Sequence, residues 1–227
     1  MTPKKSMQFL LLGLLWLLFS IPLITIGAAT ASVYYIALKI LNDEETENLF
    51  KHFARGMKDN FVQGLLMELI SIIAIGGAAA FIWWILTKSD REIIFIILAI
   101  AVCFIVLVIN IYTYPIIGRY ENTFSNMIRN TVALAFTYNR ETLRSAAFVA
   151  AQLAIAGALF RLNIFAGFVS LLFWPSVIFY TIASFMASIF YRVENPIQYD
   201  VVNSDEENPE DENQDVENEN NNNEEIE

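Results

Sequence analysis

Residues 7–26 read MQFLLLGLLWLLFSIPLITI and contain no charged side chain. An α-helix rises about 1.5 Å per residue, so a run of this length crosses a hydrocarbon core of about 30 Å. Lys4 and Lys5 precede the run and Ala29-Thr30-Ala31 follows it, which resembles a secretory signal peptide. The run is longer than the roughly 7–15 apolar residues of such a peptide, and further runs follow, so we expect an uncleaved membrane helix.

Pro22 and Gly27 bracket the end of this first run. Proline removes a backbone donor and glycine relaxes the helix, so we predict a helix break near residues 26–27. Residues 30–41 then form a shorter helix, which at about 18 Å cannot cross a membrane alone. This short helix is either re-entrant or an extension of the first helix across a kink.

Four further apolar runs follow, at residues 61–86, 93–114, 145–160 and 164–191. The runs at 61–86 and 93–114 predict a helical hairpin that Pro115 ends. The sequence therefore predicts an all-α, polytopic membrane protein with five main transmembrane runs plus the short helix after the Pro/Gly break.

The run at 145–160 is short and rich in alanine. Small residues recur in it at four-residue spacing, namely Ala146, Ala150, Ala154 and Ala158. Small residues at this spacing let helix backbones approach closely. We therefore expect this span to be central, packed against its neighbours and shielded from lipid.

Two polar segments carry apolar residues at helical spacing with basic residues between them. Residues 42–60 contain Lys51, Arg55 and Lys58, and residues 119–144 contain four arginines. Both segments predict basic amphipathic helices lying in the membrane interface, although a solvated connector explains the first equally well. Such helices suit anionic lipid headgroups better than nucleic acid, so the expected partner is the lipid bilayer and no nucleic acid.

The net charge of −10 comes from the end of the chain. Residues 193–227 hold 14 of the 24 acidic residues and no Lys or Arg, which leaves residues 1–192 with a net charge of +4. An acidic, Asn-rich segment cannot bury enough apolar surface to offset its ordering entropy. We predict a helical membrane domain at 1–192 and a disordered acidic tail at 193–227.

The distribution of basic residues tests the topology. If the first two helices return the chain to its starting side, 11 basic residues face one side and 3 face the other. If they make one crossing, the division is 9 to 5. Both arrangements stay open, and both place the amphipathic helices and the tail in the cytoplasm.

Glu68, Asn110 and Gln152 are the candidate polar site within the runs. A charged residue inside a membrane costs roughly 2.5–3.5 kcal/mol on insertion scales, which makes Glu68 a candidate for transport. Glu68 also lies near the end of its run, where it can reach the interface or pair with an arginine. Interhelical hydrogen bonding is the simpler interpretation of Asn110 and Gln152.

His52 and Cys103 are the only histidine and cysteine, so a zinc site lacks its usual ligands. The sequence contains no Gly-rich phosphate loop, serine nucleophile elbow or His-Glu metal motif. We therefore expect no cofactor and no enzymatic activity.

Several motifs carry a family resemblance. Residues 14–22 read LLWLLFSIP, and they are followed by TIGAATA at 25–31 and by Tyr34-Tyr35. Arg119-Tyr120-Glu121-Asn122, Glu141-Thr142-Leu143 and Phe173-Trp174-Pro175 come later in the chain. Over roughly residues 7–192, the chain resembles the YesL family of bacterial membrane proteins, in which proline often stands at the position of Ala28.

The resemblance implies a multi-pass protein of the bacterial plasma membrane, whose genes often neighbour those of carbohydrate uptake and breakdown. It assigns no catalytic residue. The hypothesis it favours is an accessory or regulatory component linked to carbohydrate transport, with a carbohydrate permease or another membrane protein as partner. The alternative is a small transporter or channel, which requires Glu68, Asn110 and Gln152 to converge on a cavity beside Gly27.

Overall fold

The computed structural model describes residues 2–44, 48–87, 93–121 and 123–195. Most of the described residues are helical and none forms a strand, which confirms the all-α prediction. The helices are α1 (Pro3–Phe19), the short 3-10 helix η1 (Leu23–Thr25), α2 (Ile26–Leu41), α3 (Leu49–Asp59), α4 (Phe61–Thr87), α5 (Ile93–Arg119), α6 (Phe124–Thr137), α7 (Asn139–Leu162) and α8 (Ile164–Glu194). Most of the predicted acidic tail, and residues 88–92 between α4 and α5, lie outside the described residues.

The chain divides into two compact units, Met1–Ala187 and Ser188–Glu227. The first unit contains α1 to α7 and most of α8, and every contact discussed below lies within it. In the second unit, the described residues are the last turns of α8 and the residue that follows them.

In the part of the chain that the structure describes, five segments are long and apolar enough to cross a membrane. They are Leu23–Leu41, α4, α5, α7 and α8. The predicted number of five spans is confirmed, but the first of them is Leu23–Leu41 and not the predicted run at residues 7–26. The helix at the first predicted run, α1, has only 17 residues, whereas η1 and α2 together supply 19.

The helix break falls earlier than predicted. Helix α1 ends at Phe19, and α2 already begins at Ile26, four residues before the expected start. Pro22 lies in the break, where Thr25 Oγ1 is 2.5 Å from the Phe19 carbonyl oxygen and 2.7 Å from that of Pro22. Gly27 lies inside α2, so its prediction as part of the break is wrong.

Helices α1 and α2 form an antiparallel hairpin. Lys5 Nζ lies 2.8 Å from Asp43 Oδ1, which joins the start of α1 to the end of α2. Near the opposite end, Trp16 Nε1 donates to Thr30 Oγ1 at 2.9 Å. The chain therefore returns to its starting end through α2. This is the arrangement that puts 11 basic residues on one side of the membrane and 3 on the other.

Helix α2 is the central helix. In α2, 11 of the 16 residues are buried, against five of 27 in α4 and ten of 27 in α5. It contacts α1, α3, α4 and α5. The alanine-rich helix α7 is not central: Ala146 is buried, but Ala150, Ala154 and Ala158 are exposed, because no described neighbouring helix covers that row.

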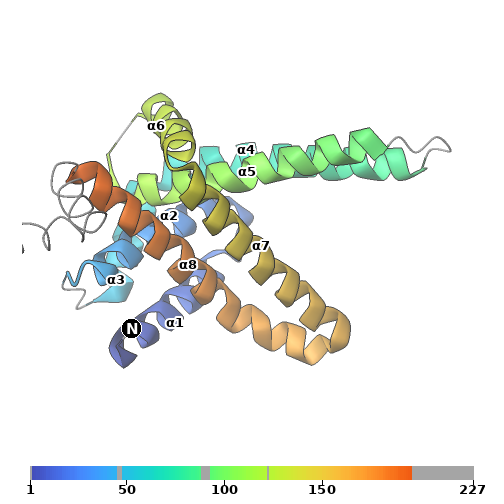
Figure 1. The fold of residues 1–227 in the computed structure, drawn as a ribbon. Coiled ribbons are helices and arrows are strands. Elements are labelled where there is room, and N and C mark those ends of the chain that lie inside the picture. Colours follow the sequence, from blue (N-terminus) through green and yellow to red (C-terminus); the bar gives the residue numbers. More distant parts are fainter. Residues whose placement is uncertain (1, 45–47, 88–92, 122, 196–227) are drawn as a thin grey trace, which may run out of the picture. The chain divides into compact units, whose positions relative to one another are not determined.

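Helices α4 and α5 lie side by side as the predicted hairpin (Figure 1). Pro115 does not end α5, which continues to Arg119. Membrane helices tolerate proline where neighbouring helices satisfy the freed backbone groups, and the last two turns of α5 are buried.

The two amphipathic segments differ in outcome. Helix α3 occupies the first, with Phe53 buried and Lys51, Arg55 and Lys58 exposed. The second segment splits between α6 and the first turns of α7, which begins at Asn139 rather than Ser145. The sequence did not predict the boundary between α6 and α7, because the first turns of α7 are charged and hydropathy groups them with the preceding polar segment.

Candidate functional site

The three polar residues predicted as an intramembrane site each bond to a neighbouring helix. The Tyr114 hydroxyl donates to Glu68 Oε2 at 3.0 Å. Asn110 Nδ2 lies 3.0 Å from Ser71 Oγ and donates to the Val106 carbonyl at 2.8 Å. These contacts join α4 to α5 at two successive turns, so the bonds stabilise the hairpin.

Gln152 belongs to a different pair of helices. Its Nε2 donates to Thr181 Oγ1 at 2.9 Å, which joins α7 to α8. The structure therefore brings Glu68 and Asn110 onto one hairpin but does not bring Gln152 to them. Each amide is used as the simpler interpretation predicts, in interhelical hydrogen bonding.

Gly27 and Glu68 do lie close together, as the transporter alternative required. A Cβ atom on Gly27 would stand 3.0 Å from Glu68 Cβ. The closeness has a packing origin, since a Cβ on Gly64 would stand 2.6 Å from Ala28 N and 2.7 Å from the Gly27 carbonyl carbon. Gly27 and Gly64 thus let the backbones of α2 and α4 touch.

A polar pocket that the sequence did not predict lies where α2, α3, α4 and α5 meet. Its volume is about 550 Å³. The residues that line it come from α2, the junction of α3 and α4, the end of α5 and the connection to α6: Tyr35, Gly56, Asp59, Asn60, Gln63, Ile117, Gly118, Arg119, Tyr120, Glu121 and Thr123.

Glycines bring the walls of this pocket together. A Cβ on Gly118 would stand 2.7 Å from Tyr35 N, and a Cβ on Gly56 would stand 2.7 Å from Ser32 Oγ. The Ser32 hydroxyl donates to the Phe53 carbonyl at 2.7 Å, which fixes α3 on α2. Both α3 and α5 therefore lie directly against α2, and the pocket opens beside these contacts.

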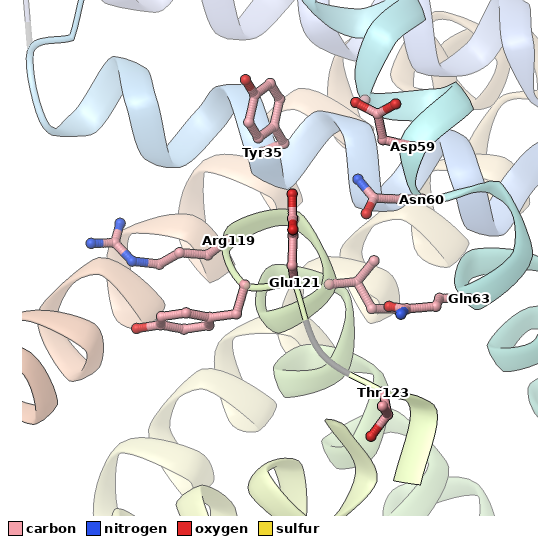
Figure 2. Close-up of a pocket in the computed structure, with 11 residues that line it drawn as sticks. Tyr35, Asp59, Asn60, Gln63, Arg119, Glu121 and Thr123 are labelled. Carbon is pink, nitrogen blue, oxygen red and sulfur yellow. The ribbon is translucent and has the colours of Figure 1, made fainter. Parts of the chain in front are cut away.

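Polar side chains from two parts of the chain face this pocket. Figure 2 shows the Glu121 carboxylate and the Asn60 amide turned toward a common space below Tyr35, with the Asp59 carboxylate above Asn60, whereas the Arg119 side chain points away from them. Asp59 and Glu121 are exposed, so water reaches this space. The arrangement offers hydrogen-bond acceptors and donors to a small water-soluble ligand.

Two of the motifs that carry the family resemblance meet here. Tyr35 comes from the Tyr34-Tyr35 motif, while Arg119, Tyr120 and Glu121 come from the four-residue motif after the third long run. The presence of these two motifs was the sequence feature that could have pointed to the pocket, but the motifs lie more than eighty residues apart. Nothing local in the sequence predicts that they meet.

A second, apolar hollow lies between α5, α6 and α7. Its volume is about 340 Å³, and its lining includes Phe104, Val108, Val132 and Phe136. Polar side chains in and beside it are engaged in the fold, since Tyr112 Oη and Thr142 Oγ1 lie 2.6 Å apart and Thr113 bonds to Thr131 at 3.1 Å. This hollow suits an acyl chain or an apolar side chain.

His52 lies on α3 and Cys103 on α5. In the part of the chain that the structure describes, no three His, Cys, Asp or Glu side chains gather as a metal site would require. The expectations of no enzymatic activity and no cofactor stay predictions.

Comparison with known proteins gives one match. No curated protein and no solved structure matches the chain. Residues 9–87, about a third of the chain, match a family described as "Protein of unknown function, DUF624". The matched region runs from α1 to the end of α4 and includes the central helix α2. Over this region, the chain is similar to an uncharacterised family of domains.

Proposed function

We propose that this chain is a non-enzymatic accessory or regulatory component of a membrane transport system, linked to carbohydrate uptake. The observation that carries the proposal is the use of the intramembrane polar groups. Glu68 and Asn110 bond within the α4/α5 hairpin, and Gln152 bonds between α7 and α8. Groups used in this way hold helices together rather than lining a shared path for a solute.

An unoccupied face of α4 supplies a surface for a partner helix. A Cβ atom added at Gly76 or Gly77 would meet no neighbouring group within 4 Å, and Ala79 and Ala80 beside them are exposed. Small residues on a lipid-facing surface let another helix approach closely. We propose that a transmembrane helix of the partner packs on this face.

Co-purification tests this role. The chain is isolated from native membranes in mild detergent, and proteins captured with it are identified and read against the neighbouring genes. We expect a sugar permease or its subunit, and we expect Gly76→Ile to reduce its capture severalfold. Gly157→Ile is the matched control, because it adds the same side chain to another open helix surface. Purification with no partner, or equal capture by both variants, contradicts the proposal.

The resemblance to the YesL family and the charge distribution support a location and an orientation. We propose that the protein lies in the bacterial plasma membrane with α3, α6 and the tail in the cytoplasm. Single cysteines at the exposed positions Lys58 and Asn130 test this orientation, after Cys103 is replaced by serine. Labelling of both in intact cells by a membrane-impermeant maleimide contradicts the proposal.

The alternative, a small transporter, is favoured by one feature, the intramembrane carboxylate Glu68 beside Gly27. The test is solute flux in proteoliposomes of the purified chain. Glu68→Gln keeps an acceptor for the Tyr114 hydroxyl and removes the charge. Flux that Glu68→Gln abolishes supports transport, and flux that survives removes the role of Glu68.

A further inference from the structure

We propose that the polar pocket between α2, α3, α4 and α5 is a binding site for a neutral polyhydroxylated solute, of the chemical class of a mono- or disaccharide. This inference goes beyond the accessory role, because the site binds its ligand whether or not a partner protein is present. It rests on the size of the pocket, its charge and the chemistry of its lining.

The size excludes a single ion as the natural occupant. The pocket holds about 550 Å³, which lies within the roughly 300–1,000 Å³ of small-molecule sites and far exceeds the about 30 Å³ of one water. A metal ion needs several oxygen ligands within about 2.6 Å. Among the described residues, Asp59 and Glu121 are the only carboxylates in the lining, and no third acidic, His or Cys side chain completes a cluster.

The charge disfavours an anion. Asp59 and Glu121 line the space, while the guanidinium of Arg119 points away from them (Figure 2). The two carboxylates repel a phosphate or a sugar phosphate, and a cation beside the lining, Lys39, is placed with its Nζ over the Tyr35 ring. A neutral ligand and an organic cation both fit this charge, so the test below includes spermidine.

The lining matches hydroxyl groups. A sugar hydroxyl both donates and accepts, the carboxylates of Asp59 and Glu121 accept, and the Asn60 amide does both. Hydrogen bonds to ionised acceptors are roughly twice as strong as neutral ones. An apolar ligand would leave these groups without partners, which is costly. Cations already lie over the rings of Tyr35 and Tyr120, Lys39 Nζ at 4.7 Å and Arg119 Cζ at 5.9 Å from the ring centroids, so the polar groups rather than ring stacking would hold the sugar.

The position of the pocket suits a ligand that arrives from water. Its walls stand where the apolar runs of the α4/α5 hairpin end, at Asn60 and Gln63 on one side and at Arg119 on the other. Asp59 and Glu121 are both exposed. A bound solute would bridge α3 to the connection before α6, so its presence would stabilise their relative placement.

The test measures binding directly on the purified full-length chain in nanodiscs. The probes are glucose, galactose, mannose, maltose and sucrose at millimolar concentrations, followed by calorimetry and thermal unfolding. We expect at least one sugar to bind saturably. At 100 times its Kd, such a ligand raises the melting temperature by roughly 5–10 °C.

Two isosteric variants locate the site. Asp59→Asn and Glu121→Gln together should weaken binding at least tenfold, whereas Glu141→Gln on α7 removes the same charge outside the pocket and should leave binding unchanged. Hydrogen exchange adds a readout on the unmodified chain, and we expect sugar to protect residues 56–63 and 117–123. This protection keeps the inference testable if the double variant fails to fold.

Three results would overturn the inference: no sugar binds the unmodified chain, the double variant binds as well as Glu141→Gln, or spermidine or phosphate binds with higher affinity than any sugar. Sugar binding by a chain that captures no permease contradicts the accessory role and supports the pocket. Permease capture by a chain that binds no sugar supports the accessory role and contradicts the pocket.

Discussion

Gly64→Ala is the substitution that tests the packing of α4 against the central helix most directly. A Cβ at this position would stand 2.6 Å from Ala28 N, 2.7 Å from the Gly27 carbonyl carbon and 2.8 Å from Ala28 Cα. All three atoms belong to the backbone of α2, which no side-chain rotation can move. The added methyl group therefore forces the two helices apart.

The magnitude follows from the geometry. Ordinary carbon contacts begin near 3.4 Å, so the helices must separate by about 0.6–0.8 Å, and a gap of about 0.5–1 Å forfeits a quarter to a half of each contact's attraction. Overpacking of this kind costs roughly 1–3 kcal/mol. Replacing a helical glycine by alanine also gains up to about 1 kcal/mol of helix propensity, which partly masks this cost.

Gly76→Ala is the matched control, because Gly76 lies on the same helix and a Cβ there meets nothing within 4 Å. The gain in helix propensity is common to both variants and cancels in their difference. We expect Gly64→Ala to be less stable than Gly76→Ala by about 1–3 kcal/mol, the packing cost alone. The assay is SDS-induced unfolding in mixed micelles, followed by circular dichroism. Equal stability of the two variants refutes the contact between α2 and α4.

Three further predictions concern the hairpins. A carbodiimide should join the Lys5 amine to the Asp43 carboxylate as an amide, seen by mass spectrometry of the digested chain, because Lys5 Nζ lies 2.8 Å from Asp43 Oδ1. Absence of this cross-link contradicts the antiparallel α1/α2 hairpin. Ser71→Ala and Asn110→Leu should show a coupling of about 0.6–1.7 kcal/mol in a double-mutant unfolding cycle, and strict additivity contradicts their bond. Trp16→Phe should destabilise the chain by about 0.5–1.5 kcal/mol in the same assay through loss of its donated hydrogen bond, and unchanged stability contradicts that contact.

Hydropathy located three of the long helices well. The predicted runs at 61–86 and 164–191 correspond to α4 and α8, and the run at 93–114 corresponds to most of α5. These helices are apolar almost throughout, so the run and the helix end close together. Helix α7 begins six residues before its run, because its first turns carry charged side chains that hydropathy excludes.

The central helix was not predictable from small-residue spacing alone. Both α2 and α7 contain several alanines, and spacing does not say which row meets a neighbour. The stretch GAATAS at 27–32 was the stronger signal, because small residues occupy every side of the helix there. Such a helix can accept neighbours on several faces at once, and α2 contacts α1, α3, α4 and α5 and, through the rings of Tyr34 and Phe179, also α8.

The pocket depends on contacts between segments far apart in the chain. Asp59 and Glu121 are each an ordinary charged residue at the end of an apolar run, and by sequence each is best explained as a solvated helix end. They line one pocket because α3 and α5 meet α2 at neighbouring turns. That geometry depends on Gly56 and Gly118, where a Cβ atom would stand only 2.7 Å from an atom of α2. The sequence alone does not show this close contact.

The three glycine contacts on α2 divide into two kinds. Gly56 and Gly118 both pack against α2 and line the pocket, so substituting either one changes helix packing and ligand binding together. Gly64 packs against α2 at Gly27 and Ala28, nearer the start of that helix, and it is not among the residues that line the pocket. If the fold tolerates Gly64→Ala and sugar binding falls with it, the pocket depends on the placement of the whole α4/α5 hairpin. A partner helix that packs on α4 could then control the pocket through that placement, with no contact to the ligand.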